Sequence, residues 1–183
     1  LSRVGRAHDF AVLYPLRILL ACAALAWLPR PPLWPWFSKR AVVVGLGAYL
    51  VWAALVPGGP GASVWQHLQG GWAWLWLVFR LLGSSLIIPL AEELAFRGFL
   101  MRRLQSADFD SLSPTQVGFL AWILSSLAFA ALHQDLLAAF LAGLAYGKLY
   151  RRGASLGEVS MAHGITNFCI GLQVLALGHW SLW

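Results

Sequence analysis

Charged residues are scarce in this sequence. Only 11% of its 183 residues are Asp, Glu, Lys or Arg, whereas 60% are apolar. A soluble globular domain carries about 25% charged and about 45–50% apolar residues, so the composition excludes an ordinary soluble fold. It predicts a polytopic membrane protein, and the length fits a single domain over residues 1–183.

Cysteine and acidic residues are also few. Cys22 and Cys169 lie in separate apolar runs without C-x-x-C spacing, which favours packing over a disulfide or a metal pair. Seven acidic residues stand against thirteen Lys and Arg, which gives a net charge of +6. In a membrane protein such an excess collects in cytoplasmic loops, so we expect no nucleic-acid partner.

The chain lacks an internal repeat, a low-complexity tail and a signal-peptide pattern at its start. It begins at Leu1 rather than Met, from which we expect a fragment or the tail of a longer protein. Apolar runs are therefore the pattern that organises the sequence.

These runs predict an all-α bundle of about six to eight membrane segments. A helix needs about 20 residues to cross a hydrocarbon core of about 30 Å. The third run is either one helix or a helix broken near Gly83 and Pro89, and the last is one segment or two. The fourth helix is expected to begin at Ser113, with Ser as N-cap and Pro next. The runs are Phe10–Leu28, Ala41–Val56, Trp72–Leu104, Val117–His133, Leu136–Tyr150 and Ser155–Gly178.

Basic residues between these segments predict the orientation. With alternate crossings, three basic clusters fall on one side, which the positive-inside rule makes cytoplasmic. Arg3 and Arg6 would lie on the other side, against the rule. The clusters consist of Arg30, Lys39, Arg40, Arg102, Arg103, Lys148, Arg151 and Arg152.

Three charged residues form a cluster within the third apolar run: Glu92, Glu93 and Arg97. A charge near the bilayer centre costs about 2.5–3.5 kcal/mol on insertion scales, so such residues suggest a functional site. Glu93 and Arg97 are four residues apart and can pair, whereas Glu92 lies about 100° around the helix. One carboxylate is then neutralised and the other stays available for chemistry. The alternative is a buried ion pair that only joins helices.

Two histidines lie in or beside apolar segments. Phe129 precedes His133 by four residues, and Asn167 follows His163 by four. Because buried polar groups need partners, we expect the polar residues of three segments to meet in one cavity. A carboxylate hydrogen-bonded to a histidine can deprotonate water, and a histidine with an amide can stabilise an oxyanion. These parts together describe the hydrolysis of an acyl bond, which in a membrane is most naturally a peptide bond.

Three short motifs share this order along the chain. E-E-x-x-x-R, F-x-x-x-H and H-x-x-x-N occur as Glu92-Glu93…Arg97, Phe129…His133 and His163…Asn167. With them the sequence resembles the CPBP family, the CaaX prenyl proteases and bacteriocin-processing-like membrane proteins, over about residues 75–170. The part from Leu144 to Trp180 resembles a narrower bacterial branch that is associated with, and sometimes fused to, exosortases. A chain without an initiator Met would suit such a fused tail.

The resemblance implies an intramembrane endopeptidase of the bacterial inner membrane. Glu92 would activate water with the aid of His133, while His163 and Asn167 would stabilise the oxyanion. The implied partners are membrane lipid and a peptide or protein substrate, either lipidated or carrying a sorting signal.

The resemblance gives the remaining motif residues supporting roles. Glu93 and Arg97 would form a structural pair that positions Glu92, and Phe129 would pack rather than react. Two histidines and a glutamate could instead ligate zinc, but the H-E-x-x-H spacing of membrane zinc proteases is absent. We therefore expect a mechanism without metal or other cofactor.

Two other functions compete with this interpretation. A serine protease of the rhomboid type would use Ser85, but its G-x-S sequence has no following glycine. A non-catalytic membrane binding or immunity protein would keep the same polar cluster for structure alone.

Overall fold

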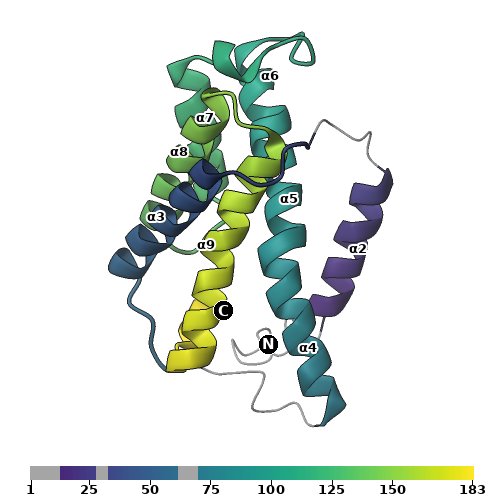
Figure 1. Cartoon of the computed structure of the whole chain (residues 1–183), viewed down its shortest axis with the longest axis vertical. Helices are drawn as coiled ribbons and strands as arrows, with labels where there is room; N and C mark the ends of the chain where they lie inside the picture. The colour runs from purple at the N-terminus through teal and green to yellow at the C-terminus, as the bar shows by residue number, and fades with distance from the viewer. Residues whose placement is uncertain (1–12, 28–32, 62–69) are drawn as a thin grey trace.

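The computed structural model describes residues 13–27, 33–61 and 70–183, and every regular element in these ranges is helical. The rod from Gly71 to Gln105 runs through five of these elements without a break, which makes six long helices in the part described (Figure 1). The predicted all-α class is confirmed. In chain order the elements are α2 (Tyr14–Trp27), α3 (Lys39–Leu55), α4 (Gly71–Leu82), η2 (Gly83–Ile87), α5 (Ile88–Glu93), η3 (Leu94–Leu100), α6 (Met101–Gln105), η4 (Pro114–Gln116), α7 (Phe119–Ala130), α8 (Leu136–Arg151), α9 (Leu156–Leu177) and η5 (Trp180–Leu182).

Most predicted segments agree with these helices within a few residues. The third run is a single rod, in which the stretch around Gly83 continues as a π-helix rather than breaking. The last run is one helix that ends at Gly178, whose φ of 67° is the left-handed conformation that favours glycine at a helix end. The start and end of the first predicted run, Phe10 and Leu28, lie outside the described residues, as do Arg3, Arg6 and Arg30.

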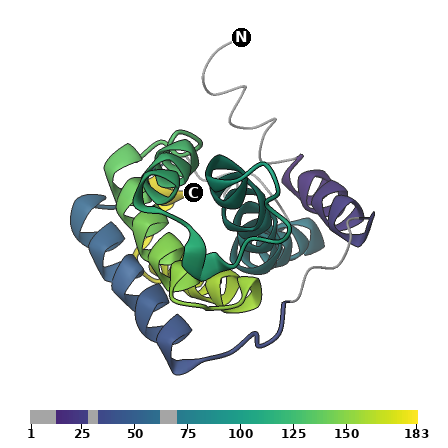
Figure 2. The same cartoon turned by 90° about the horizontal axis from the view of Figure 1, so that it is seen from above.

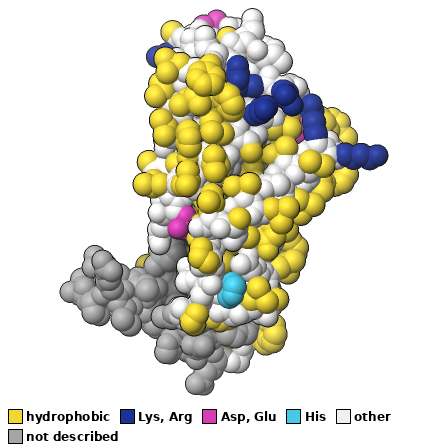
Figure 3. All heavy atoms as spheres, turned by 90° about the vertical axis from the view of Figure 1, so that its left-hand side faces the viewer, with side chains coloured by type: hydrophobic (Ala, Val, Ile, Leu, Met, Phe, Trp, Pro, Cys, Tyr) yellow, Lys and Arg dark blue, Asp and Glu magenta, His cyan; other side chains and the backbone are white. Residues whose placement is uncertain are grey.

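Among the described residues, two helices are long and apolar enough to cross a membrane, Gly71–Gln105 and Leu156–Leu177, and α2 and α7 are shorter apolar helices. Only 28% of the most apolar window of the first is buried inside the chain. Large apolar side chains cover much of the surface, as Figure 3 shows for one face. A soluble monomer rarely exposes so extended an apolar surface, whereas lipid would cover it.

Helix α9 lies at the centre of the bundle. It packs against α3, α8, α5 and η2, while α7 packs against α8. Seen from above, α3 and α2 lie at opposite edges of the molecule (Figure 2). The rod contacts both α7 and α9, which brings the three motif-bearing segments together.

Glycines allow the closest of these contacts. In α8, Gly143 faces Phe129 and Arg97, and Gly147 faces the Trp122 ring. These two glycines, which are spaced as G-x-x-x-G, therefore allow close packing within the chain.

The described basic residues of the predicted clusters gather at one end of the bundle. Two of the three guanidinium nitrogens of Arg40, Nε and Nη2, donate to the two carboxylate oxygens of Glu158 at 2.9 Å each. Arg40 lies at the start of α3. Arg151, at the end of α8, donates to the carbonyl of Val117 at 2.8 Å. On the face that Figure 3 shows, Lys and Arg side chains lie in the upper part of the molecule. Ser155 and Glu158 form a capping box at the start of α9, an S-x-x-E signal that the sequence interpretation missed.

The fourth helix begins later than predicted. The predicted cap at Ser113 is present, but it starts only the three-residue turn η4, and α7 begins at Phe119. The Gly118 N–H donates to Oε1 of Gln105 at 2.8 Å, which holds the start of α7 level with the end of α6. His133 lies three positions past Ala130, the last residue of α7, in the turn before α8. Its ring packs against that of Phe129, which also contacts the His163 ring, so the motif residues of α7 and α9 meet.

Candidate active site

The rod changes its helical form on both sides of the two glutamates. The π-helical segments η2 and η3 flank α5, which carries Glu92 and Glu93. π-helical turns leave backbone carbonyls for side chains, and they are frequent at functional sites. Here Phe96 O accepts from Ser125 Oγ at 2.9 Å, and Ser84 O accepts from Asn167 Nδ2 at 2.8 Å. Helices α7 and α9 are thereby tied to the rod above and below the glutamates.

Glu93 and Arg97 form the pair that their spacing predicts. Arg97 Nη1 donates to Glu93 Oε1 at 2.9 Å, and both side chains are 0% exposed. Arg97 Nη2 donates to Gly143 O at 2.9 Å, and its guanidinium lies 4.6 Å from the centre of the Phe129 ring. The pair therefore joins the rod to α8 as well as neutralising one acid.

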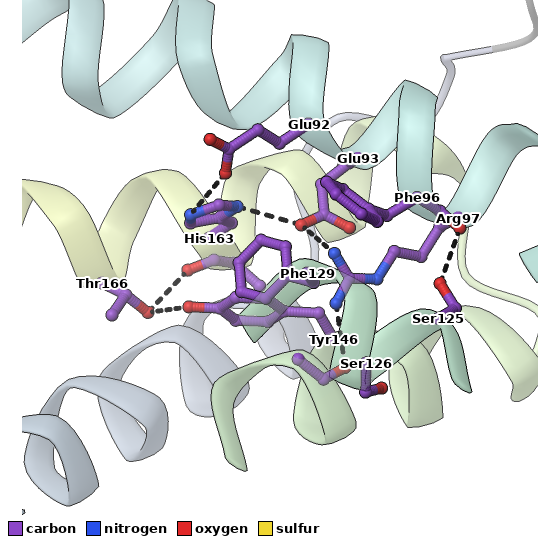
Figure 4. A network of polar contacts seen from close by, with 12 residues as sticks. Glu92, Glu93, Phe96, Arg97, Ser125, Ser126, Phe129, Tyr146, His163 and Thr166 are labelled. Carbon is purple, nitrogen blue, oxygen red and sulfur yellow. Dashed lines mark hydrogen bonds and ion pairs between the residues drawn. The ribbon is translucent and has the colours of Figure 1, made fainter. Parts of the chain in front are cut away.

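His163 connects this pair to the second glutamate (Figure 4). Its Nδ1 lies 2.9 Å from Glu93 Oε1, and its Nε2 lies 3.9 Å from Glu92 Oε2. Because a carboxylate accepts, Nδ1 donates to Glu93. The imidazole is 3% exposed and stacks on the Tyr146 ring with 4.9 Å between the ring centres. Its Nε2 is thus held toward Glu92.

The two adjacent carboxylates lie in different surroundings. Glu93 is fully buried in the ion pair, whereas the Glu92 side chain is 20% exposed. In the described residues, the basic group found near the Glu92 carboxylate is the His163 imidazole. The distance from Nε2 of His163 to Oε2 of Glu92 is 3.9 Å, which is too long for a hydrogen bond. A water molecule at hydrogen-bond distance from both atoms would lie beside the line that joins them, not on it.

His133 lies beside the aromatic residues of α7. Its Nδ1 lies 2.9 Å from the Phe129 carbonyl, and the ring centres of these two residues are 4.5 Å apart. Because the carbonyl accepts, Nδ1 donates and Nε2 carries the lone pair in the neutral ring. In the described residues no direct contact joins His133 to Glu92, so the expected pairing of these two groups is not present as a hydrogen bond.

A cavity of about 640 Å³ adjoins this cluster. Its wall includes His133, His163 and Asn167, together with Phe129 and Tyr146. Glu92, Glu93 and Arg97 are not part of the wall. The expected meeting in one cavity is therefore observed for His133, His163 and Asn167 but not for the charged residues of the rod, and His163 is the residue that belongs both to the ion-pair cluster and to the cavity.

Tyr146 and Thr166 support His163, and neither was identified from the sequence. Tyr146 stacks on the imidazole and donates from its hydroxyl to Thr166 Oγ1 at 2.7 Å, and Thr166 donates to Gly45 O at 2.9 Å. Both side chains are about 1% exposed. Thr166 lies three residues after His163, on the same helix face, which was the available signal.

The donor atoms do not fit a zinc site. In the ranges that the structure describes, no three side chains of His, Cys, Asp or Glu form a group that could hold a metal ion. Glu93 Oε1 and His163 Nδ1 are already bonded to each other, and Arg97 takes the same oxygen. Zinc needs three or four such atoms at about 2.0–2.2 Å.

An all-helical chain with an ion-pair and histidine cluster inside an apolar bundle belongs to the class of integral membrane proteins with a polar internal site. The model of the family described as type II CAAX prenyl endopeptidase Rce1-like matches residues 72–169, more than half of the chain. The chain belongs to this family, which is a family of membrane-integral, helical proteases. No curated protein and no solved structure matches the chain. The matched range contains all seven motif residues, while the exosortase-associated branch stays a prediction.

The contact between α9 and the rod gives a first prediction. A Cβ at Gly164, next to His163, would collide with the backbone carbonyl of Ser85. Gly164→Ala should force the helices apart and destabilise the protein by about 1–3 kcal/mol, as overpacking does, and the melting temperature in detergent reports it. Gly47→Ala is the matched control, since a Cβ there meets nothing within 4 Å. Equal melting temperatures for the two variants would contradict the contact.

Proposed function

We propose that this protein is an intramembrane endopeptidase that hydrolyses a peptide bond with a water molecule activated by Glu92. The observation that supports this proposal is that the two neighbouring glutamates lie in different surroundings. Glu93 is fixed in a buried pair with Arg97, while Glu92 is left outside it, partly exposed and facing His163 Nε2. A carboxylate in this position can accept a proton.

The proposed reaction has two steps. The water oxygen attacks the carbonyl carbon of the scissile bond while Glu92 takes one water proton, which leaves a tetrahedral oxyanion. Glu92 then gives that proton to the amide nitrogen as the C–N bond breaks, which releases an amine and a carboxylic acid. Glu92 is thus the general base of the first step and the general acid of the second, so it returns to its ionised form when the reaction is complete.

Asn167 and His163 are the proposed donors to the oxyanion. One N–H of the Asn167 amide donates to Ser84 O, and the second is available to the cavity that Asn167 lines. His163 Nδ1 already donates to Glu93, so donation from Nε2 requires the imidazolium form. That form gives the cluster two carboxylates and two cations, with Arg97 as the other cation, and so leaves it without net charge.

His133 has a different proposed role. With Nδ1 bonded to the Phe129 carbonyl, its Nε2 can accept a hydrogen bond from a water molecule in the cavity. It would orient that water toward Glu92 without touching the carboxylate itself. Phe129 packs on Arg97 and on both site histidines, which supports a purely structural role.

The substrate in this proposal is a peptide in or beside the bilayer, either lipidated or carrying a sorting signal. The family supports a peptide or protein substrate. We further propose the bacterial inner membrane as the location, with the basic end of the bundle in the cytoplasm, because Lys and Arg gather there.

The test is a cleavage assay with the purified chain in lipid vesicles, using lipidated and unlipidated fluorogenic peptides. Ser85→Ala should cleave as wild type does, because the Ser85 hydroxyl is buried and has no hydrogen-bond partner in the part of the chain that the structure describes. A metal chelator should leave the rate unchanged. Loss of cleavage in Ser85→Ala would favour the serine mechanism, and chelator sensitivity would favour zinc. No cleavage of any peptide would favour the non-catalytic binding protein.

A further inference from the structure

One cation in the rod has no part in this mechanism. Arg80 is the one charged residue between Trp72 and Leu90, within the apolar helix α4. An arginine in such a helix costs about 2.5–3.5 kcal/mol on insertion scales, and residues of this kind usually have a partner or a ligand.

The described surroundings of Arg80 are aromatic rather than acidic. Its guanidinium lies 4.5 Å from the centre of the Tyr14 ring and 5.3 Å from that of Trp183. Trp76 and Trp180 pack edge-on against Trp183. Among the residues with described positions, no Asp or Glu forms an ion pair with Arg80.

A second guanidinium shares the wall with Arg80. Arg17 lines the same cavity, and its charge is close enough to act on that of Arg80. Asp135 also lines the cavity but is exposed at the turn before α8 and forms no ion pair with Arg80 in the described residues. Two like charges in a partly enclosed, aromatic wall attract an anion, and arginine suits carboxylates and phosphates because its donors form a planar fork.

The cavity that holds these cations is the one that reaches the proposed active site. His133, His163 and Asn167 line it together with Arg17 and Arg80. Arg80 precedes Glu92 by twelve positions along the rod, a rise of roughly 18 Å in a helix. An extended peptide covers that length with roughly five residues.

We propose that Arg80, supported by Arg17, is the binding site for an anionic group, a carboxylate or a phosphate, of a molecule that enters this cavity. A peptide source rests on the proposed function: the substrate then carries a carboxylate no more than about five residues from the bond that is cleaved. A lipid source would be a phosphate headgroup at the cavity mouth. The anion site itself depends on neither.

Binding rather than cleavage tests this site. The Glu92→Gln protein is used throughout, so that no peptide is hydrolysed and a failure of the proposed chemistry does not affect the result. The probe is a dye-labelled, N-acylated apolar hexapeptide, offered as the C-terminal acid and as the C-terminal amide. We expect the acid to bind at least about tenfold more tightly, the strength of one charge-assisted hydrogen bond.

The added substitution Arg80→Gln should remove this preference and leave the affinity for the amide unchanged, which also shows that the cavity is intact. Arg80→Lys should keep part of the preference. Arg103→Gln, which removes the same charge from an exposed position beyond the end of the cavity, should keep all of it.

A parallel arm compares lipid bilayers of phosphatidylglycerol and phosphatidylcholine for Arg80-dependent retention of labelled lipid. A preference for the peptide acid identifies a substrate carboxylate, and a preference for phosphatidylglycerol alone identifies a headgroup phosphate. Absence of any Arg80-dependent preference in both arms would overturn the proposal.

Discussion

Glu92→Gln should lower the rate of peptide cleavage at least about a hundredfold without changing the helix content or the melting temperature. General acid–base catalysis contributes about 10²–10⁴-fold, and the amide of Gln can neither take the proton from water nor return it. Stability should be unchanged because Glu92 lies outside the buried pair and its carboxylate makes no hydrogen bond in the described residues. Initial rates with one fluorogenic peptide in lipid vesicles measure the effect.

Asp135→Asn is the matched control for this experiment. Asp135 is an acidic residue that lines the cavity itself, but it is exposed and lies at the turn before α8. The same loss of charge there should change the rate less than about twofold, as expected for a surface substitution. Equal rate losses in the two variants would mean that the cavity needs negative charge in general rather than a base at Glu92.

The structure separates two interpretations that the sequence left open for the charged cluster. A buried ion pair that joins helices describes Glu93 and Arg97, which contact α9 and α8 through His163 and Gly143. It does not describe Glu92, whose carboxylate is outside that network. The ion-pair interpretation therefore applies to Glu93, and Glu92 is left available for the proposed chemistry.

Helix geometry is the reason why part of this site could be predicted. An i to i+4 pair such as Glu93 and Arg97 depends only on residues of one helix, so spacing determines it. Convergence of three segments followed from the cost of leaving polar groups unpaired in an apolar bundle. Both arguments are local or general, and neither needs the packing of particular side chains.

The contacts of His133 and His163 could not be predicted in the same way. Which imidazole faces Glu92 depends on where α7 and α9 meet the rod. The late start of α7 at Phe119 sets the depth of His133, and the close approach of Gly164 to Ser85 sets that of His163. The first depends on a bond from Gly118 to Gln105 across two helices, for which the sequence holds no spacing signal.

Arg97→Met should be the most destabilising substitution in the cluster. Arg97 is 0% exposed, and without it the equally buried Glu93 keeps only the hydrogen bond from His163. Removing one partner of a buried pair costs about 3–5 kcal/mol, since the other charge is left without compensation. The measurement is thermal unfolding in detergent, followed by circular dichroism, with the exposed Arg103→Met as control, expected to lie within about 0.5 kcal/mol of wild type.

A double variant shows whether the uncompensated charge is the cause. Glu93→Gln combined with Arg97→Met removes both charges, keeps a side chain of similar size at each position and should recover a large part of the lost stability. It should not recover cleavage, because the Gln amide no longer gives His163 a charged acceptor at Nδ1 and so weakens the imidazolium that the oxyanion needs. Equal stability of Arg97→Met and Arg103→Met would show that the pair does not hold the bundle together. Stability that returns together with full cleavage would show instead that the pair acts only as a joint between helices and that Glu92 works without it.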